Sequence, residues 1–311
     1  MLTIFSCPKP FTDPHINIIQ TNAVKSWTLL KPRPEIILIG DEEGVSDICE
    51  ELGLRHILKV ERNEFGTPLL DSVFYLAQEA AAFSILCYIN ADIILLSDFI
   101  IALKKACGHL QEQDFLLIGR RWNLEISRPL TFDREWETEL RTLVKKEGQL
   151  SSPSAIDYFV FTKGMYKNIP PFALGRGRWD NWLVWYAISL KVPVVDLSDV
   201  NIVVHQRHDY AHLTARGFKV EVNPEQSYNE KLIGRNWHFY VRNIWDSTYV
   251  LDCVGIRRAP GWRRLDSWLE RLMGFVCVKL KEFNPYSYPA FVFGKRLYRI
   301  ISRVRNVIHN L

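Results

Sequence analysis

Short apolar runs that alternate with helical patterns fill the first two hundred residues of this 311-residue chain. Each run is only a few residues long and almost wholly apolar, as in strands that are covered on both faces of a sheet. Strands that alternate with helices predict an α/β fold, with a mostly parallel sheet flanked by helices on both faces. The predicted strands are Leu2–Phe5, Glu35–Gly40, His56–Val60, Phe83–Ile89, Phe115–Gly119 and Asp157–Phe161.

Helices are predicted in the gaps between these strands. Thr67 and Pro68 have the residue types of an N-cap and a first helical position, and apolar residues at helical spacing follow them. Ser97 is the predicted N-cap of a second helix, and residues 44–52 form a shorter third. In sheets of this kind ligands bind beyond the carboxyl ends of the strands, so the residues that follow each strand are the candidate site residues.

The alternation of strands and helices ends near residue 250. It predicts a domain of residues 1–250 and a mainly helical extension of residues 251–311. From Arg257 to Leu311 there are twelve Lys and Arg against three Asp and Glu, although the whole chain has a net charge of only +4. Basic and apolar residues at helical spacing favour a helix that lies on an anionic membrane, or equally one that packs on the domain with a solvated basic face.

Composition excludes several classes of protein. A net charge of +4 does not provide a generally basic surface for nucleic acid, so no nucleic-acid partner is expected. The six cysteines include no CxxC pair, which argues against a zinc ribbon, a redox motif or a disulfide scaffold. Neither a secretory leader nor an apolar run of about 18 residues is present. We therefore expect a cytoplasmic protein, or one on the cytoplasmic face of a membrane.

The strongest predicted strand ends in the tripeptide Asn90-Ala91-Asp92, which is followed by an apolar pair. This position holds a carboxylate at the edge of the sheet, where its hard oxygen suits Mn²⁺ or Mg²⁺ and the free positions of the metal suit a diphosphate. The alternative interpretation is an aspartate in an ordinary turn after a strand.

A second polar end follows the apolar run 201–204. His205 comes directly after it, and an imidazole suits Mn²⁺ as a ligand. A histidine of the core is the alternative, and a zinc site is disfavoured because no second ligand has the usual spacing. His208 is interpreted as a contact to substrate or to the fold.

A third element is the loop Gly175–Arg178, which leads into an aromatic helix. Asp180 lies near the start of that helix, where it would act as a general base toward a sugar hydroxyl. Trp179 and Trp182 flank it, and indole faces stack on sugar rings, which would account for some of the ten tryptophans. The alternative is a capping aspartate on a tryptophan-rich core helix.

These three elements, in this order, resemble the GT-A family of nucleotide-sugar glycosyltransferases over about residues 1–215. The resemblance implies a Rossmann-like fold, with Asn90-Ala91-Asp92 at the position of the DxD motif that binds the metal and the nucleotide. It implies His205 as a further metal ligand, Asp180 as the base of an inverting reaction and Asp41 as the acid that contacts the nucleoside. The chain departs from the motif at Asn90, where the family has aspartate, and this affects how tightly a metal is held.

Three further residues next to predicted strands are weaker candidates, with Asp157 near the start of the sixth strand. Arg62 is a candidate partner of the diphosphate, or an arginine of a solvated loop. Arg120 follows the fifth strand and would meet a phosphate or the acceptor. Asp157 would bind a sugar hydroxyl, or pair with a neighbouring arginine.

The expected function is transfer of a hexose from a nucleotide sugar, with UDP as the first candidate, to a hydroxyl of a glycan or a lipid-linked acceptor. Mn²⁺ or Mg²⁺ would neutralise the leaving diphosphate. One alternative is a sugar-1-phosphate nucleotidyltransferase, which is disfavoured because the loop after the first strand, Cys7–Phe11, has no glycine. The other is a non-catalytic scaffold docked on a membrane.

Overall fold

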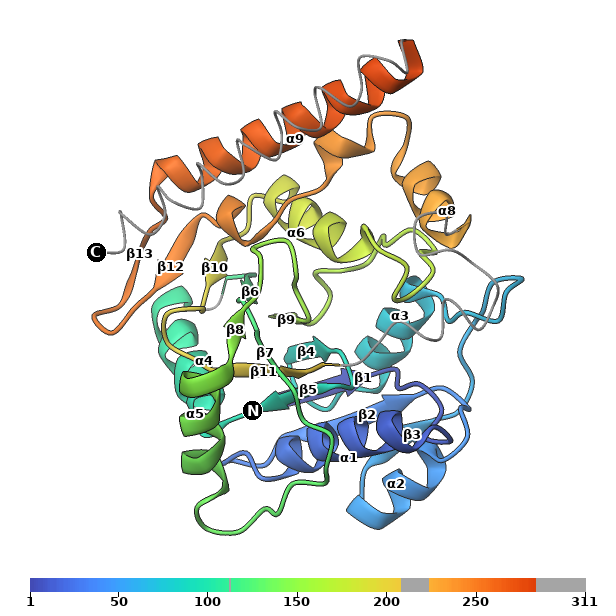
Figure 1. The fold of residues 1–311 in the computed structure, drawn as a ribbon, viewed down its shortest axis with the longest axis vertical. Helices are drawn as coiled ribbons and strands as arrows, with labels where there is room; N and C mark the ends of the chain where they lie inside the picture. The colour runs from blue at the N-terminus through green and yellow to red at the C-terminus, as the bar shows by residue number, and fades with distance from the viewer. Residues whose placement is uncertain (112, 208–223, 284–311) are drawn as a thin grey trace.

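The computed structural model describes residues 1–111, 113–207 and 224–283, and it confirms the predicted mostly parallel sheet with helices on both faces (Figure 1). Within these residues the main sheet has nine strands in the order β13-β12-β10-β6-β9-β4-β1-β2-β3, so β13 and β3 are its edges. β9 is antiparallel to both neighbours and β13 to β12, while the other neighbours are parallel. The strands are β1 Leu2–Ser6, β2 Glu35–Ile39, β3 Arg55–Ile57, β4 Ile85–Ile89, β6 Leu116–Ile118, β9 Tyr158–Thr162, β10 Val194–Asp196, β12 Tyr249–Leu251 and β13 Ile256–Arg258.

A smaller sheet crosses the end of β4 and has the order β5-β11-β7-β8. β5 begins only four residues after β4 ends, and it pairs antiparallel with β11. This pairing carries residues near position 205 to the carboxyl edge of the main sheet. The strands are β5 Ile93–Leu95, β7 Trp122–Leu124, β8 Gln149–Leu150 and β11 Val203–Gln206.

The helices pack in two layers around the main sheet, because its central strands are buried on both faces. In β1, Ile4 packs among residues of α1, α2 and α4, and the next residue, Phe5, packs among residues of α3 and α6. α5 covers the smaller sheet instead. The helices are α1 Pro14–Thr28, α2 Val45–Leu52, α3 Leu70–Ala80, α4 Ser97–Leu110, α5 Trp136–Glu147, α6 Trp179–Ser189, α8 Pro224–Ile233 and α9 Gly261–Phe283, with 3-10 turns η1 Trp237–Tyr240 and η2 Ile244–Asp246.

Two predicted helix starts differ from those observed. α3 begins at Leu70 rather than at Pro68, because the Asn63 side chain accepts the backbone N–H of Thr67 and holds that segment in a turn. Ser97 does not cap α4 with its own side chain. Its N–H and hydroxyl instead donate to the Glu137 carboxylate of α5, at 3.0 and 2.6 Å, so the cap comes from another helix.

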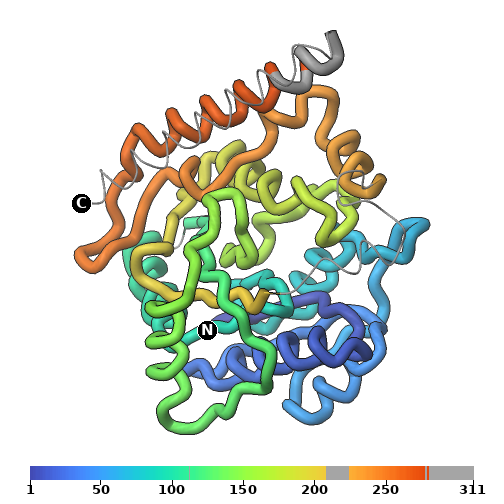
Figure 2. The backbone as a smooth tube through the Cα atoms, in the orientation of Figure 1, coloured from blue at the N-terminus to red at the C-terminus, as the bar shows by residue number. Residues whose placement is uncertain are grey.

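The predicted boundary after residue 250 falls inside β12, and α9 then packs across η1 and η2 (Figures 1 and 2). Arg263, near the start of α9, forms an ion pair of 2.9 Å with Asp196 at the end of β10. None of the helices in the described part of the chain is both long and apolar enough to cross a bilayer. Residues 284–311, which are part of the predicted helical extension, and His208 lie outside the described residues.

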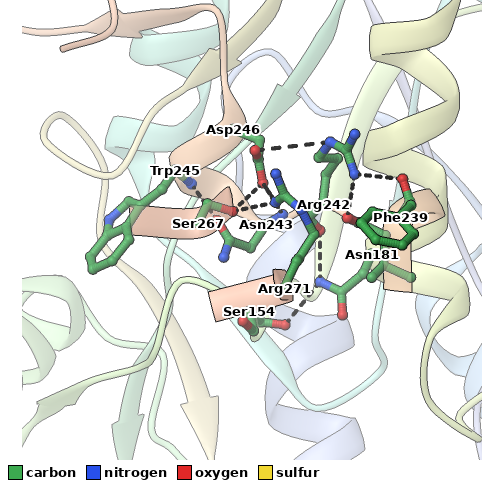
Figure 3. Close-up of polar contacts among 10 residues, drawn as sticks. Ser154, Asn181, Phe239, Arg242, Asn243, Trp245, Asp246, Ser267 and Arg271 are labelled. Atoms are coloured by element: carbon green, nitrogen blue, oxygen red, sulfur yellow. Dashed lines mark hydrogen bonds and ion pairs between the residues drawn. The ribbon is translucent and has the colours of Figure 1, made fainter. Parts of the chain in front are cut away.

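Asp246 is the centre of the contact between α9 and the rest of the protein (Figure 3). Its Oδ2 accepts from Arg271 Nη1 at 2.7 Å and from Ser267 Oγ at 2.5 Å, both on α9. The same oxygen accepts the backbone N–H of Asn243 at 3.0 Å. Arg242 lies 3.9 Å from the other carboxylate oxygen, and its backbone N–H donates to the Asn181 carbonyl of α6. A continuous set of polar contacts therefore joins α9 to the first turn of α6.

We expect Arg271→Ala to lower the free energy of unfolding by about 1.5–3 kcal/mol, because it removes charged hydrogen bonds from the buried Asp246. Urea unfolding would measure this as a lower midpoint. Arg264→Ala is the matched control, because Arg264 lies on the same helix but is exposed, and it should change stability by less than about 0.5 kcal/mol. Equal midpoints for the two variants would show that this contact does not hold α9.

Candidate active site

A cavity of about 440 Å³ opens at the carboxyl ends of the central strands. Its walls are the loop after β1, the start of α1, the loop before α3, the link from β4 to β5, and the loop before α6. This is the edge of the sheet at which ligands bind in open α/β folds. The lining residues are Cys7, Pro8, Lys9, Pro10, Thr12, Asp13, Ile16, Ile19, Gln20, Glu42, Gly66, Thr67, Pro68, Tyr88, Asn90, Ala91, Asp92, Arg121, Asp157, Leu174, Gly175, Arg176 and His205.

Asp92 and His205 meet in this cavity although they are far apart in the sequence. The antiparallel pairing of β5 with β11 places His205 opposite Ile93, and His205 Nε2 lies 3.5 Å from Asp92 Oδ2. The buried Gln206 fixes the backbone of Asp92, because its main-chain and side-chain N–H groups both donate to the Asp92 carbonyl, at 3.3 and 3.1 Å. The pair predicted from two separate strand ends thus forms one site.

This pair has the chemistry of a partial metal site. A carboxylate oxygen and an imidazole nitrogen suit Mn²⁺, and the carboxylate suits Mg²⁺. In the described part of the chain, no three His, Cys, Asp or Glu side chains gather closely enough to hold a metal by themselves. The residues therefore fit a metal that takes two ligands from Asp92 and His205 and the remainder from a bound diphosphate and water.

Asp157 lies beside Asn90 at the same edge, because β9 is antiparallel to β4 and starts where β4 ends. The Asn90 side-chain amide donates to Asp157 Oδ1 at 2.8 Å, and Arg121 forms an ion pair with the same oxygen. The other oxygen, Asp157 Oδ2, is buried and has no hydrogen-bond partner among the described residues. The Asp157 side chain thus pairs with an arginine, as one interpretation of the sequence expects. It also lines the cavity, so the other interpretation, a contact with a sugar hydroxyl, stays a prediction.

Asp180 stands in the first turn of α6 and is not among the residues that line the cavity. Burial, and to a lesser extent the negative charge of Asp157, raise the pKa of Asp180 to about 6. Its Oδ1 has no hydrogen-bond partner within the described part of the chain. A carboxylate with this pKa is ionised at neutral pH yet holds a proton more readily than an ordinary aspartate, as general bases do.

The raised pKa of Asp180 predicts a pH-dependent effect of Asp180→Asn on stability. The unfolded chain releases this proton near the ordinary pKa of 3.8, so ionisation of Asp180 opposes folding as the pH rises from about 4 to above 6. We expect Asp180→Asn to be more stable than the wild type at about pH 8, by roughly 2–3 kcal/mol, and to lose this advantage near pH 4. Urea unfolding at both pH values would measure it.

Asp47→Asn is the control for that measurement, because Asp47 is an exposed carboxylate in the first turn of α2. It should gain no stability at about pH 8, since a negative charge there favours the helix N-terminus. A stability difference for Asp180→Asn that is the same at both pH values would contradict the raised pKa.

Asp41 and Arg62 come together at the rim of the cavity rather than in its lining. Arg62 donates to Asp41 at 2.6 Å, to Glu42 at 2.8 Å and to the Gly66 carbonyl at 2.9 Å. The hydrogen bond from Arg62 lowers the pKa of Asp41, whose side chain is 66% exposed. Of this group the cavity is lined by Glu42 and Gly66, so Glu42 is the acid that reaches the site.

Arg120 points away from the cavity, whereas its neighbour Arg121 lines it. Nε of the Arg120 guanidinium donates to the Ser151 carbonyl at 2.8 Å. Burial lowers the pKa of Arg120. Successive side chains of an extended segment point in opposite directions, so only one of two adjacent arginines faces the ligand. The sequence shows the pair but not which member faces inward.

Trp179 and Trp182 are buried in the core layer formed by α3 and α6. The Trp179 ring contacts Tyr88 edge to face at 5.4 Å, and Trp182 stacks on Tyr186 at 5.0 Å. The structure therefore places both indoles where the core-helix interpretation expects them, away from the cavity.

The loops that line the cavity are fixed by side chains that sequence reasoning missed. The Gln20 amide of α1 accepts the N–H of Lys9 at 2.7 Å and donates to its carbonyl at 2.9 Å, which fixes the loop after β1. Arg176 forms an ion pair of 2.7 Å with the buried Glu225 of α8. A glutamine among the apolar residues of α1 is the one signal in the sequence for the first contact.

Comparisons with known proteins give similarities of fold. No family model matches the chain, and no curated protein matches it. Glucosyl-3-phosphoglycerate synthase from Mycobacterium tuberculosis, in complex with Mn²⁺, UDP and phosphoglyceric acid, matches 69% of this chain and 74% of its own, at 14% identity and a TM-score of 0.41. S. aureus TarS in complex with UDP-GlcNAc matches 92% of this chain and 75% of its own, at 11% identity and a TM-score of 0.49. The third is a Bacillus anthracis protein in complex with sucrose, which is named as a glucose-1-phosphate thymidylyltransferase. It matches 73% of this chain and 99% of its own, at 10% identity and a TM-score of 0.40.

Proposed function

We propose that this protein is a glycosyltransferase that moves a hexose from a nucleotide sugar, with UDP as the first candidate, to a hydroxyl of a glycan or a lipid-linked acceptor. The observation that carries the proposal is the convergence of Asp92 and His205, 3.5 Å apart, in a cavity that Asp157 also lines, with Asp180 close enough to Asp157 to respond to its charge. Such a transfer needs ligands for a metal that neutralises the leaving diphosphate, and a base for the acceptor hydroxyl. Asp92 with His205 would provide the first, and a carboxylate with a raised pKa would provide the second.

Asp92 and His205 are the residues that would hold Mn²⁺ or Mg²⁺, which when bound neutralises the charge on the leaving diphosphate. Gln206 fixes the main chain of Asp92, so the position from which its side chain extends is set before any ligand binds. The loop after β1, fixed by Gln20, and the Glu42 carboxylate form the part of the cavity that would receive the nucleoside.

Asp180 is the proposed base for the acceptor hydroxyl. Its carboxylate takes the hydroxyl proton while the acceptor oxygen attacks the anomeric carbon and the bond to the diphosphate breaks, so the configuration inverts. Its pKa of about 6 leaves it ionised at neutral pH and strengthens it as a proton acceptor relative to an ordinary aspartate. The Asn181 side chain donates to the Arg242 carbonyl at 2.9 Å, which helps to fix the start of α6 on which Asp180 stands.

Calorimetric titration of UDP, with Mn²⁺ and then with EDTA, tests the donor site. Because Asp92 would help to hold a metal that neutralises the diphosphate, we expect binding that EDTA weakens and that Asp92→Ala weakens by about tenfold or more. Asp180→Asn should keep wild-type UDP binding and lose transfer, which separates the base from the donor site. Asp47→Asn, at an exposed position of α2, is the control for loss of a carboxylate.

Two outcomes would contradict the assignment. If Asp92→Ala binds UDP as the wild type does, with the same dependence on Mn²⁺, the assignment of Asp92 and His205 as metal ligands is wrong. If the wild type binds neither UDP nor other nucleotides, the protein is not a glycosyltransferase and the scaffold interpretation takes its place. Formation of a sugar nucleotide from a sugar 1-phosphate would instead identify a nucleotidyltransferase.

The outer face of α9 is the proposed contact with an anionic membrane, near which a lipid-linked acceptor would be found. Asp266 and Ser267 turn inward, so Leu265 and Trp268 turn outward and are 53% and 48% exposed. Arg264 is exposed on the same face, and positive charge beside an indole suits the interface of an anionic lipid layer.

Co-sedimentation with vesicles tests this surface. We expect binding to vesicles that contain phosphatidylglycerol, weaker binding to neutral vesicles and loss of binding at high salt. The double variant Trp268→Ala with Leu265→Ala should weaken binding by about tenfold or more, since both side chains lose burial in lipid. Ile101→Ala, an exposed apolar residue on α4, is the control. Unchanged binding of the double variant would exclude α9 as the contact.

A further inference from the structure

Asn90 stands where the resembled motif has aspartate, and every polar atom of its side chain is used inside the protein. Its Oδ1 accepts from the Tyr88 hydroxyl at 3.1 Å, and its Nδ2 donates to Asp157 Oδ1 at 2.8 Å. Its backbone N–H also donates to the Asp157 carbonyl at 2.9 Å. The side chain of Asn90 is thus engaged with Asp157 and Tyr88, and the amide is the group that this environment requires.

An aspartate at position 90 would not fit this environment. It would place a second carboxylate about where the Asn90 amide now lies, 2.8 Å from Asp157, and two carboxylates at such a distance repel each other. The amide converts that repulsion into a hydrogen bond. The carboxylate that is absent at position 90 is therefore supplied, from the neighbouring antiparallel strand, by Asp157.

The two oxygens of Asp157 differ sharply. Oδ1 receives both the Asn90 amide and the Arg121 guanidinium, which together set the plane of the carboxylate. Oδ2 is buried without a hydrogen-bond partner among the described residues, in a side chain that lines the cavity and belongs to a residue only 5% exposed. A buried carboxylate oxygen without a donor is costly, and such atoms are normally satisfied by a bound group.

We propose that Asp157 Oδ2 accepts a hydrogen bond from a hydroxyl of the transferred sugar, and that Asn90 and Arg121 are positioning residues that orient it. This inference rests on the proposed function and adds the sugar-binding group to it. Asp157 lies beside Asn90, which is two residues from Asp92 in the sequence, so a sugar attached to a diphosphate held at Asp92 would lie near this oxygen. The ligand class is a neutral hexose with a free hydroxyl.

The test compares the affinities of UDP and of a neutral UDP-hexose for the full chain, with Mn²⁺ present. UDP-glucose, UDP-galactose and UDP-N-acetylglucosamine are the probes, and the one that binds the wild type best is used. We expect it to bind the wild type more tightly than UDP does. Asp157→Asn should keep the affinity for UDP within about twofold and reduce the advantage of the UDP-hexose by about tenfold or more.

An exchange of the two side chains separates sugar binding from folding. Asn90→Asp alone should lower the thermal midpoint, because it sets two carboxylates against each other. The double variant Asn90→Asp with Asp157→Asn restores an amide beside a carboxylate, so it should regain most of that midpoint. It should still lack the preference for the UDP-hexose, because the group that faces the cavity is now an amide. If Asp157→Asn alone does not fold, the double variant replaces it in the comparison of UDP and UDP-hexose affinities.

Each contrary result has a distinct meaning. A wild type that binds no UDP overturns the proposed function and this inference with it. A wild type that binds UDP and the UDP-hexoses equally, or an Asp157→Asn variant that keeps the preference for the hexose, overturns the inference alone. Equal weakening of UDP and the UDP-hexose by Asp157→Asn also overturns it, since the residue would then act on the nucleotide or on the fold.

Discussion

The insertion of β9 between β4 and β6, antiparallel to both, is the constraint on which the candidate site depends. In a fully parallel sheet the first residue of a strand lies at the edge opposite the ligand. Because β9 is reversed, its first residues lie at the same edge as the last residues of β4, and the backbone N–H of Asn90 bonds to the Asp157 carbonyl. One reversed strand thus supplies a buried carboxylate to an edge that parallel strands furnish only with their ends.

Behind the polar groups lies an aromatic layer that fixes their positions. Tyr88 is in contact with Phe74, stacked at 5.5 Å, and with Trp179, edge to face at 5.4 Å. Aromatic pairs of this kind add stability beyond the area that they bury. Trp179 is the residue before Asp180, so its packing sets where α6 begins, and the apolar surroundings that it helps to create are the cause of the raised pKa of Asp180.

Much of this arrangement could be predicted from the sequence, because apolar runs and the polar residues after them mark strand ends. Asp92 and His205 were predicted in this way. The direction of β9 could not be predicted, since an apolar run such as 158–161 has no polarity of its own. The three-residue strands β12 and β13 are too short to give a pattern, so the expected boundary at residue 250 divides β12.

The side-chain orientations that the sequence could not predict have a common physical origin. The sequence shows that tryptophans are abundant, but burial decides whether an indole packs in the core or meets a ligand, and burial depends on which helix face meets the sheet. The same holds for Arg120 and Arg121, adjacent residues of which one lines the cavity. Contacts between distant segments, such as Gln20 with Lys9, leave no local pattern at all.

The two edge strands of the main sheet are protected against pairing with a strand of another molecule. The outermost strands, β3 and β13, have three residues each, and the exposed Arg55, Arg257 and Arg258 lie on them. An edge strand offers free backbone groups to any passing strand, and short length and positive charge are the usual protection. Neither end of the nine-stranded sheet therefore invites a strand from a second molecule, which guards the protein against domain swapping and fibril growth.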